Sequence, residues 1–202
     1  MLCLSNQKLL GEIMSTGKIH IAGLGQLTFE EWAELEPATP LSVIPVEGRP
    51  AFYVGETPQS EDTYLDPSAG SSFSEIYTTD SIDVRINLYG FSSPSAPGVF
   101  EYRYLINDAG LTNEDAQRLL NFLPDAYEAW AINGYRVAVN CQAGLNRSSL
   151  FAAMMLITDG FSPERAIQLI RDNRSSLCLV NQDFVDFLMS NEKVIRQAGL
   201  GE

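Results

Sequence analysis

The sequence predicts a single α/β domain in which a central, mostly parallel or mixed sheet is flanked by helices. Short apolar runs alternate with segments whose apolar residues recur at helical spacing, which is the pattern of an α/β layer fold. The chain has 202 residues, 45% of them hydrophobic, and is therefore long enough for one full core. We expect residues 1–70 to supply an extension and the first strands of this domain, and residues 71–202 to form its main body.

Local patterns predict the individual elements. Strands are expected where short apolar runs lie between turn residues, at 18–23, 41–46, 82–88, 100–106 and 135–140. Helices are expected at 28–36, from Thr112 onward, at 147–158, at 162–173 and at 181–190. Pro124 should kink or restart the helix after Thr112, and Asn133-Gly134 should end it. The Gly-, Pro- and Ser-rich segment 55–74 is expected to be a surface loop.

The charge of the chain disfavours two classes of partner. It has 26 acidic and 13 basic residues, a formal net charge of -13. Each contact with a phosphate group needs a lysine or arginine, so extended binding to nucleic acid or to an anionic membrane is disfavoured. No stretch reaches the roughly 18 apolar residues of a membrane span.

The cysteines indicate the redox environment. Cys3, Cys141 and Cys178 are an odd number and form no small disulfide framework. Because residues 1–14 also lack the features of a secretory signal, we expect free thiols and a cytoplasmic protein. Cys178 is expected to be buried, with a role as disulfide partner of Cys141 under oxidation as the alternative. His20 is the one histidine, so no metal site with His and Cys spacing is expected.

The strongest functional pattern is the run VAVNCQAGLNRSS at 137–149. Cys141 ends a predicted strand, and Arg147 begins an apolar helix six positions later. A loop wrapped at a helix N-terminus points backbone N–H groups inward, and this positive field favours the thiolate form that attacks. An arginine side chain can bind two phosphate oxygens with its planar fork. We therefore predict a nucleophile, Cys141, in a phosphate-binding loop formed by Gln142, Ala143, Gly144, Leu145, Asn146 and Arg147.

The run from Cys141 to Ser148 resembles the Cys-x5-Arg-Ser/Thr signature of the protein tyrosine and dual-specificity phosphatase superfamily. The resemblance covers about residues 76–190, including the segments PERAIQLIRDNR and NQDFVDFL. It implies that residues 71–202 are a phosphatase catalytic core without metal or other cofactor. It also implies that Cys141 forms a cysteinyl-phosphate, which water then hydrolyses, and that Arg147 stabilises the transition state.

The same resemblance implies further roles. The family uses an aspartate on an upstream loop as general acid and then as base. Asp108, which lies 33 residues before Cys141, is the candidate by its spacing; Asp115 is the alternative, although its capping position gives it a structural role. Ser148 is expected to hydrogen-bond the sulfur, and Asn181 to lie near the attacking water.

The chain departs from the family at one position, because Asn140 stands where a histidine normally precedes the nucleophile. An asparagine side chain carries no positive charge, so slower catalysis is expected.

Three functions are therefore compared. The leading hypothesis is a phosphatase acting on phosphotyrosine in proteins, with phosphoserine, phosphothreonine and small phosphomonoesters as further substrates. A second is a catalytically weak module that binds phosphorylated partners. A third is an enzyme similar to the RNA 5′-triphosphatases, whose Gly-x-Asn-Arg loop matches 144–147; an RNA 5′ end would then be the one nucleic acid partner. Phosphoinositides are disfavoured because the loop contains no lysine.

Overall fold

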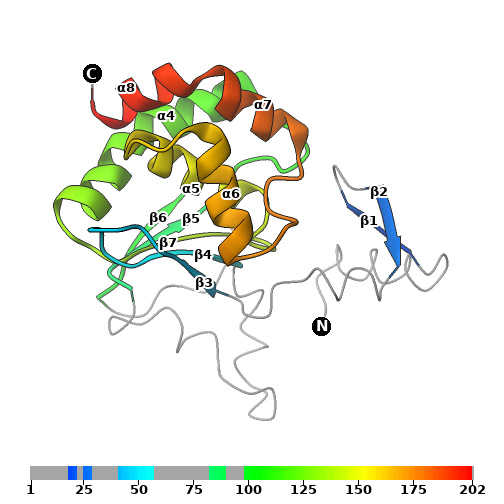
Figure 1. Ribbon diagram of the computed structural model, residues 1–202, viewed down its shortest axis with the longest axis horizontal. Coiled ribbons are helices and arrows are strands. Elements are labelled where there is room, and N and C mark those ends of the chain that lie inside the picture. The colour runs from blue at the N-terminus through cyan, green and yellow to red at the C-terminus, as the bar shows by residue number, and fades with distance from the viewer. Residues whose placement is uncertain (1–17, 22–24, 29–40, 57–81, 90–97, 202) are drawn as a thin grey trace, which may run out of the picture.

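A computed structural model describes residues 18–21, 25–28, 41–56, 82–89 and 98–201 (Figure 1). Five strands form one sheet in the order β3-β4-β7-β5-β6. Their bounds are Leu41–Ile44 for β3, Phe52–Glu56 for β4, Val137–Cys141 for β7, Val84–Asn87 for β5 and Phe100–Arg103 for β6. β3 is antiparallel to β4 and the other neighbours are parallel, which confirms the expected mixed, mostly parallel sheet. β1 (Lys18–Ile21) and β2 (Gly25–Thr28) form a separate antiparallel pair.

The central strand β7 is the strand that ends at the cysteine. All five of its residues are buried, and β4 and β5 pair with its two edges. A short run of apolar residues suits such a strand, since both faces of a parallel sheet are normally covered. The sheet therefore holds Cys141 at a fixed position in the middle of the domain.

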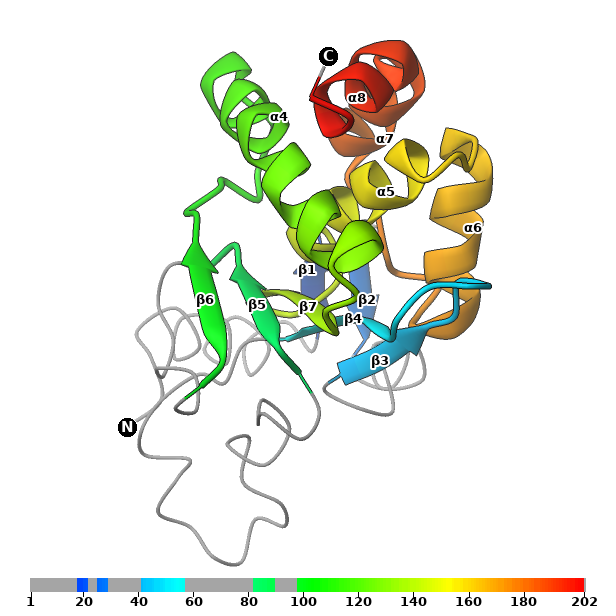
Figure 2. The same ribbon diagram turned by 90° about the vertical axis from the view of Figure 1, so that its left-hand side faces the viewer.

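The described helices lie together on one side of the five-stranded sheet, as Figure 2 shows. Their bounds are Asn113–Tyr127 for α4, Arg147–Thr158 for α5, Pro163–Asn173 for α6, Gln182–Ser190 for α7 and Glu192–Gly199 for α8. α5 is buried along its whole length, because it packs on β7 and against α4, α6, α7 and α8. Its sequence is apolar all round, as expected for a helix inside a core.

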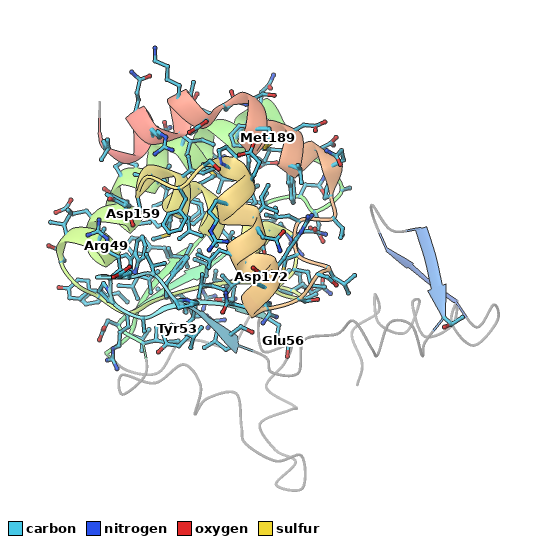
Figure 3. All side chains as sticks on the ribbon, viewed as in Figure 1. Arg49, Tyr53, Glu56, Asp159, Asp172 and Met189 are labelled. Carbon is cyan, nitrogen blue, oxygen red and sulfur yellow. The ribbon has the colours of Figure 1, made fainter. Side chains whose placement is uncertain are left out.

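Long-range hydrogen bonds of Arg49 connect the β3–β4 side of the sheet to the helical layer. Arg49, between β3 and β4, donates from Nε to Oδ1 of Asp159 at 2.9 Å, just after α5 (Figure 3). It also donates from Nη1 to the carbonyl of Ala131 at 2.9 Å. The same Asp159 oxygen accepts from the hydroxyl of Tyr127 at 3.0 Å.

Of the two outcomes expected at Pro124, a kink or a restart of the helix, the restart is wrong. α4 continues through Pro124 to Tyr127 and then widens into a π-helical turn at Glu128–Ile132, which Asn133 closes with a 2.9 Å bond to the carbonyl of Glu128. A proline inside a helix removes one hydrogen bond and crowds the preceding turn. Burial of the flanking Leu123 and Ala126 in the core stabilises the helix in spite of this loss.

Other differences concern strand and helix bounds. Neither β4 nor α8 was predicted from the sequence. The predicted loop at 55–74 begins too early, because β4 includes Gly55 and Glu56. The expected strand 100–106 ends at Arg103. The rest of that loop and the predicted helix 28–36, apart from Thr28 in β2, lie outside the described residues. The predicted helices at 147–158, 162–173 and 181–190 are confirmed within one residue.

Candidate active site

The candidate site lies at the carboxyl ends of β5 and β7, where ligands commonly bind in α/β sheets. Cys141 is the last residue of β7 and is 2% exposed. Residues 142–146 then form a loop, and Arg147 is the first residue of α5. The strand, loop and helix thus follow one another as the sequence predicts.

The carbonyl groups of this loop are bound from outside. Arg174 donates to the carbonyl of Ala143 at 3.3 Å and also to that of Gly144. The backbone N–H of Leu179 donates to the carbonyl of Leu145 at 3.1 Å. In a trans peptide the C=O and the following N–H point in opposite directions, so these contacts turn the N–H groups of residues 144–146 toward the inside of the loop. None of these three N–H groups donates to another backbone group among the described residues.

Such a row of inward N–H groups at the start of a helix is an anion cradle. Its shape requires a glycine at one point, because Gly144 has a φ of +67°. A Cβ there would also overlap the backbone of Gly55 and the guanidinium of Arg174. Gly144 therefore allows both the turn of the loop and its close contact with β4.

The side chain of Arg147 is almost fully buried, with 6% exposed, and lies beside the cradle. Nη1 donates to the carbonyl of Ile106 at 3.3 Å, and Nε is 3.4 Å from Oδ1 of Asp108. The ring of Tyr89 lies 5.4 Å from the guanidinium carbon. A cation at a helix N-terminus is unfavourable by itself, so these contacts hold a charge that an anion in the cradle would further stabilise.

Asp108 is the carboxylate that the structure places next to Arg147. Partial burial raises the pKa of Asp108, and the nearby Arg147 guanidinium opposes that rise. Asn181 fixes the position of this loop, because its Nδ2 donates to the carbonyl of Asp108 at 2.8 Å. The N–H of Asn181 donates to Oδ1 of Asn146 at 3.3 Å, so one residue connects the aspartate loop to the cradle.

Asp115, the alternative acid, is occupied as a helix cap. Its N–H donates to Oγ1 of Thr112 at 3.1 Å, and its carboxylate accepts from the same hydroxyl at 2.9 Å. This is the capping arrangement predicted from the sequence, and it gives Asp115 a structural role at the start of α4.

The next two residues are Ser148, which contacts the sulfur of Cys141, and Cys178, the second cysteine among the described residues. Oγ of Ser148 is 3.4 Å from Sγ, within hydrogen-bonding distance for sulfur. Cys178 is fully buried, and burial raises the pKa of its thiol, which keeps it protonated. Both Cys141 and Cys178 are free thiols in this structure.

A buried arginine contacts the residue that precedes Cys141, and the sequence patterns did not identify it. Arg85, on β5, is 1% exposed and donates from Nε to Oδ1 of Asn140 at 2.9 Å. Its Nη1 is 3.8 Å from the carboxylate of Glu101 on β6. A basic residue in the middle of the apolar run IDVRINL was the available signal, because an arginine in a buried strand needs a polar partner.

The part of the chain that the structure describes contains no group of three His, Cys, Asp or Glu side chains that could hold a metal ion. Among the same residues, no helix is both long enough and apolar enough to cross a membrane.

Taken together, the sheet, the helical layer and the strand-loop-helix segment define an α/β protein in which a loop suited to an anion follows a buried cysteine. The model of the dual specificity phosphatase catalytic domain matches residues 64–194, and the chain therefore belongs to this family. A search of curated protein sequences finds no match.

Solved structures of phosphatases show the same fold at low sequence identity. Human DUSP28 has a TM-score of 0.59 at 21% identity, over 80% of this chain and 99% of its own. A mouse protein described as a dual specificity phosphatase, complexed with zinc tungstate, has a TM-score of 0.59 at 23% identity, over 79% of this chain and 89% of its own. Tk-PTP in its active form has a TM-score of 0.56 at 22% identity, over 75% of this chain and 97% of its own.

Proposed function

We propose that this chain is a cysteine-dependent phosphatase that hydrolyses phosphomonoesters, with phosphotyrosine in proteins as its leading substrate. The observation that carries the proposal is the 3.4 Å contact between Arg147 and Asp108 beside the cradle. Arg147, at the start of α5, and Asp108, a carboxylate with a raised pKa on the loop after β6, come from segments far apart in the chain and lie side by side. Cys141 belongs to the same strand-loop-helix segment as Arg147. Phosphate-ester hydrolysis needs this combination of groups.

In the first step, the thiolate of Cys141 forms an S–P bond while the P–O bond to the leaving group breaks. Asp108 gives its proton to the leaving oxygen, and the inward N–H groups with Arg147 stabilise the charge on the phosphoryl oxygens. In the second step, Asp108 takes a proton from water, whose oxygen bonds to phosphorus as the S–P bond breaks. Ser148 would donate a hydrogen bond to the departing thiolate, and Asn181 holds the Asp108 loop in place.

The charge around the cradle favours a single phosphate group. Arg147 is the basic side chain within residues 141–148, and the guanidinium of Arg174 is bound to carbonyl groups of the loop. A triphosphate end or a phosphoinositide with several phosphates would need more cations. The mouse relative binds tungstate, a tetrahedral oxyanion of similar shape to phosphate.

The ring of Tyr89 supports an aromatic substrate. It lies 5.4 Å from the guanidinium carbon of Arg147 and is half-buried at the edge of the site. An aromatic surface beside a phosphate-binding arginine can stack on the ring of a phosphotyrosine. Phosphoserine and phosphothreonine remain further candidate substrates because the general acid can protonate their leaving oxygens as well.

Asn140 does not by itself argue for a non-catalytic module. Its side chain is bonded to Arg85, so a buried guanidinium stands next to the residue that replaces the family's histidine. This neighbour is a cation, and Glu101, which lies 3.8 Å from Nη1 of Arg85, offsets part of its charge.

The domain division and the location in the cell are also proposals. We propose that residues 1–70 extend the domain whose catalytic core is residues 71–202. β3 and β4, from the first part, belong to the same sheet as β5 and β7, which supports one domain. The free thiols of Cys141 and Cys178 support a reducing compartment such as the cytoplasm.

The test is hydrolysis of a small aryl phosphate and of a phosphotyrosyl peptide, with vanadate as inhibitor. We expect turnover by the wild type, loss of turnover in Cys141→Ser, and wild-type turnover in the matched control Cys178→Ser, checked for folding by circular dichroism. Retained phosphopeptide binding without any turnover would identify a binding module instead. Faster phosphate release from triphosphate-ended RNA, unaffected by Asp108→Asn, would identify an RNA 5′-triphosphatase.

A further inference from the structure

A second concave site lies at the end of the sheet opposite to the cradle. It is a surface hollow of about 290 Å³ between β5, β6, the end of α4 and the segment before β7. Its floor includes Val84, the first residue of β5, whereas Cys141 is the last residue of the neighbouring β7. Because β5 and β7 are parallel, the hollow lies at the amino ends of these strands and the cradle at their carboxyl ends. A ligand in the hollow would leave the cradle open.

Aromatic rings form one wall of the hollow. Phe100 is 68% exposed, Tyr135 is 42% exposed and Tyr102 is 38% exposed. The ring of Tyr102 packs on Phe122 with their centroids 4.9 Å apart, so this part of the wall is anchored to the core. No ring contact of Phe100 or Tyr135 occurs among the described residues. Their exposed faces are available to a ligand.

Two carboxylates also line the hollow. Asp125 lies in the last turn of α4, and Glu128 begins the π-helical turn three residues later, so both lie on the same side of the helix. Neither carboxylate has an ion pair with a described residue. The C-terminal end of a helix carries partial negative charge and favours cations, and the last turn of α4 contains no basic residue. The helix continues through the π-helical turn to Ile132, so the two acids lie in its C-terminal part, where no basic residue balances them.

Exposed aromatic rings and unpaired carboxylates that line the same hollow can together bind a cation. A guanidinium or ammonium group is attracted both to the faces of aromatic rings and to carboxylates. The lining residues include no lysine or arginine to compete for this position. The net charge of -13 would further attract a basic partner.

We propose that this hollow is a docking site for an arginine or lysine side chain in a basic segment of a protein substrate or partner. The cation lies between the rings of Phe100 and Tyr135 and the carboxylates of Asp125 and Glu128, while the rest of the segment runs along the outermost strand β6. The site selects partners by a sequence away from the phosphate group. It does not depend on the chemistry of Cys141.

The test uses the full chain and a short capped peptide in which arginine alternates with valine. Binding is followed by the NMR shifts of backbone amides, with the same peptide carrying glutamate for arginine as the negative control. We expect shifts in residues 100–103 and 125–135. We also expect the double variant Asp125→Asn/Glu128→Gln to weaken binding about tenfold or more, equivalent to about 1.4 kcal/mol. Hydrolysis of an aryl phosphate by this variant should stay at the wild-type rate.

A matched variant separates a specific site from general charge attraction. Asp172→Asn/Asp186→Asn removes the same charge from exposed positions on α6 and α7, and Asp172 is labelled in Figure 3. We expect this variant to bind the arginine peptide within twofold of the wild type. Equal weakening in both double variants, equal binding of the glutamate peptide, or no binding at millimolar peptide would overturn the proposal. Phe100→Ser, which keeps every charge, should also weaken binding.

Discussion

Nε of the buried Arg85 donates a 2.9 Å hydrogen bond to Oδ1 of Asn140, the residue immediately before Cys141. Nδ2 of Asn140 in turn lies 3.5 Å from Oδ1 of Asn87, and Nη1 of Arg85 lies 3.8 Å from Glu101. The amide at position 140 is therefore held in one orientation by neighbours on β5. Asn140 and Arg85 act as a pair, so a change in one should depend on the identity of the other.

This pairing predicts strong coupling between substitutions at the two positions. Asn140→His alone should lower kcat/KM, because Arg85 loses its acceptor and a protonated imidazole would face a like charge. Arg85→Leu alone should destabilise the fold, because it removes the donor to the buried Oδ1 of Asn140, whereas Glu101 keeps its ion pair with Arg103. The double variant should recover part of both losses, with a coupling energy of about 1–3 kcal/mol. Aryl phosphate hydrolysis and urea unfolding of the four proteins measure it; additive effects would show that the two residues are independent.

The raised pKa of Asp108 predicts the shape of the pH profile. A general acid works while protonated, so kcat falls as pH rises through the pKa of Asp108 in the complex. The side chain of Asp108 is 48% exposed, but its partial desolvation still raises this pKa, so the fall occurs at higher pH than for a fully solvated aspartate. Asp108→Asn should reduce kcat roughly 10²–10⁴-fold and remove the basic side of the profile.

Two comparisons sharpen that measurement. An aryl phosphate with a very acidic leaving group needs little protonation, so Asp108→Asn should cost less activity with it. Asp186→Asn, a substitution of an exposed aspartate on α7, should leave the profile unchanged. A basic side that persists in Asp108→Asn would assign the general acid to another residue.

Arg174 should control anion affinity without touching the anion. It donates to the carbonyls of Ala143 and Gly144 and to that of Val54 at 3.1 Å. Arg174→Met removes these donors, so the peptide planes of the cradle can turn and its N–H groups lose their common direction. We expect vanadate inhibition to weaken about tenfold or more, which corresponds to about 1.4 kcal/mol. The exposed Arg165→Met on α6 is the matched control, and equal vanadate affinity in both variants would contradict this role.

The contact between Asp83 and Arg136 predicts a specific sensitivity to acid. The carboxylate accepts from the backbone N–H of Arg136 at 2.8 Å and from its Nε at 3.0 Å. These hydrogen bonds lower the pKa of Asp83. A lowered pKa contributes stability that is present above the unfolded value of about 3.9 and is lost as pH falls through the folded value.

Asp83→Asn should therefore be less stable than the wild type near neutral pH and should approach it in acid. Urea unfolding at pH 7 and at pH 3 measures the two differences. A difference that stays the same at both values would show that the charge of Asp83 does not contribute.

The sequence alone predicts the features that depend on neighbouring residues. The spacing of Cys141 and Arg147, between a β-branched run and an apolar helix, fixed the place of the cradle in the fold. The helix starts at Thr112, Ser162 and Asn181 were readable because a cap bonds to a residue only two or three positions away. Such short-range geometry follows from backbone chemistry and needs little knowledge of the rest of the chain.

The tertiary structure decided what depends on residues far apart. β4 was missed because Gly55 and Glu56 run into a polar segment, and its pairing between β3 and β7 provides the hydrogen bonds that make it a strand. The contact of Arg174 with Ala143 spans 31 positions and that of Arg85 with Asn140 spans 55. Local patterns report which residues can form a strand, loop or helix, but the partners of a buried charge depend on how those elements pack.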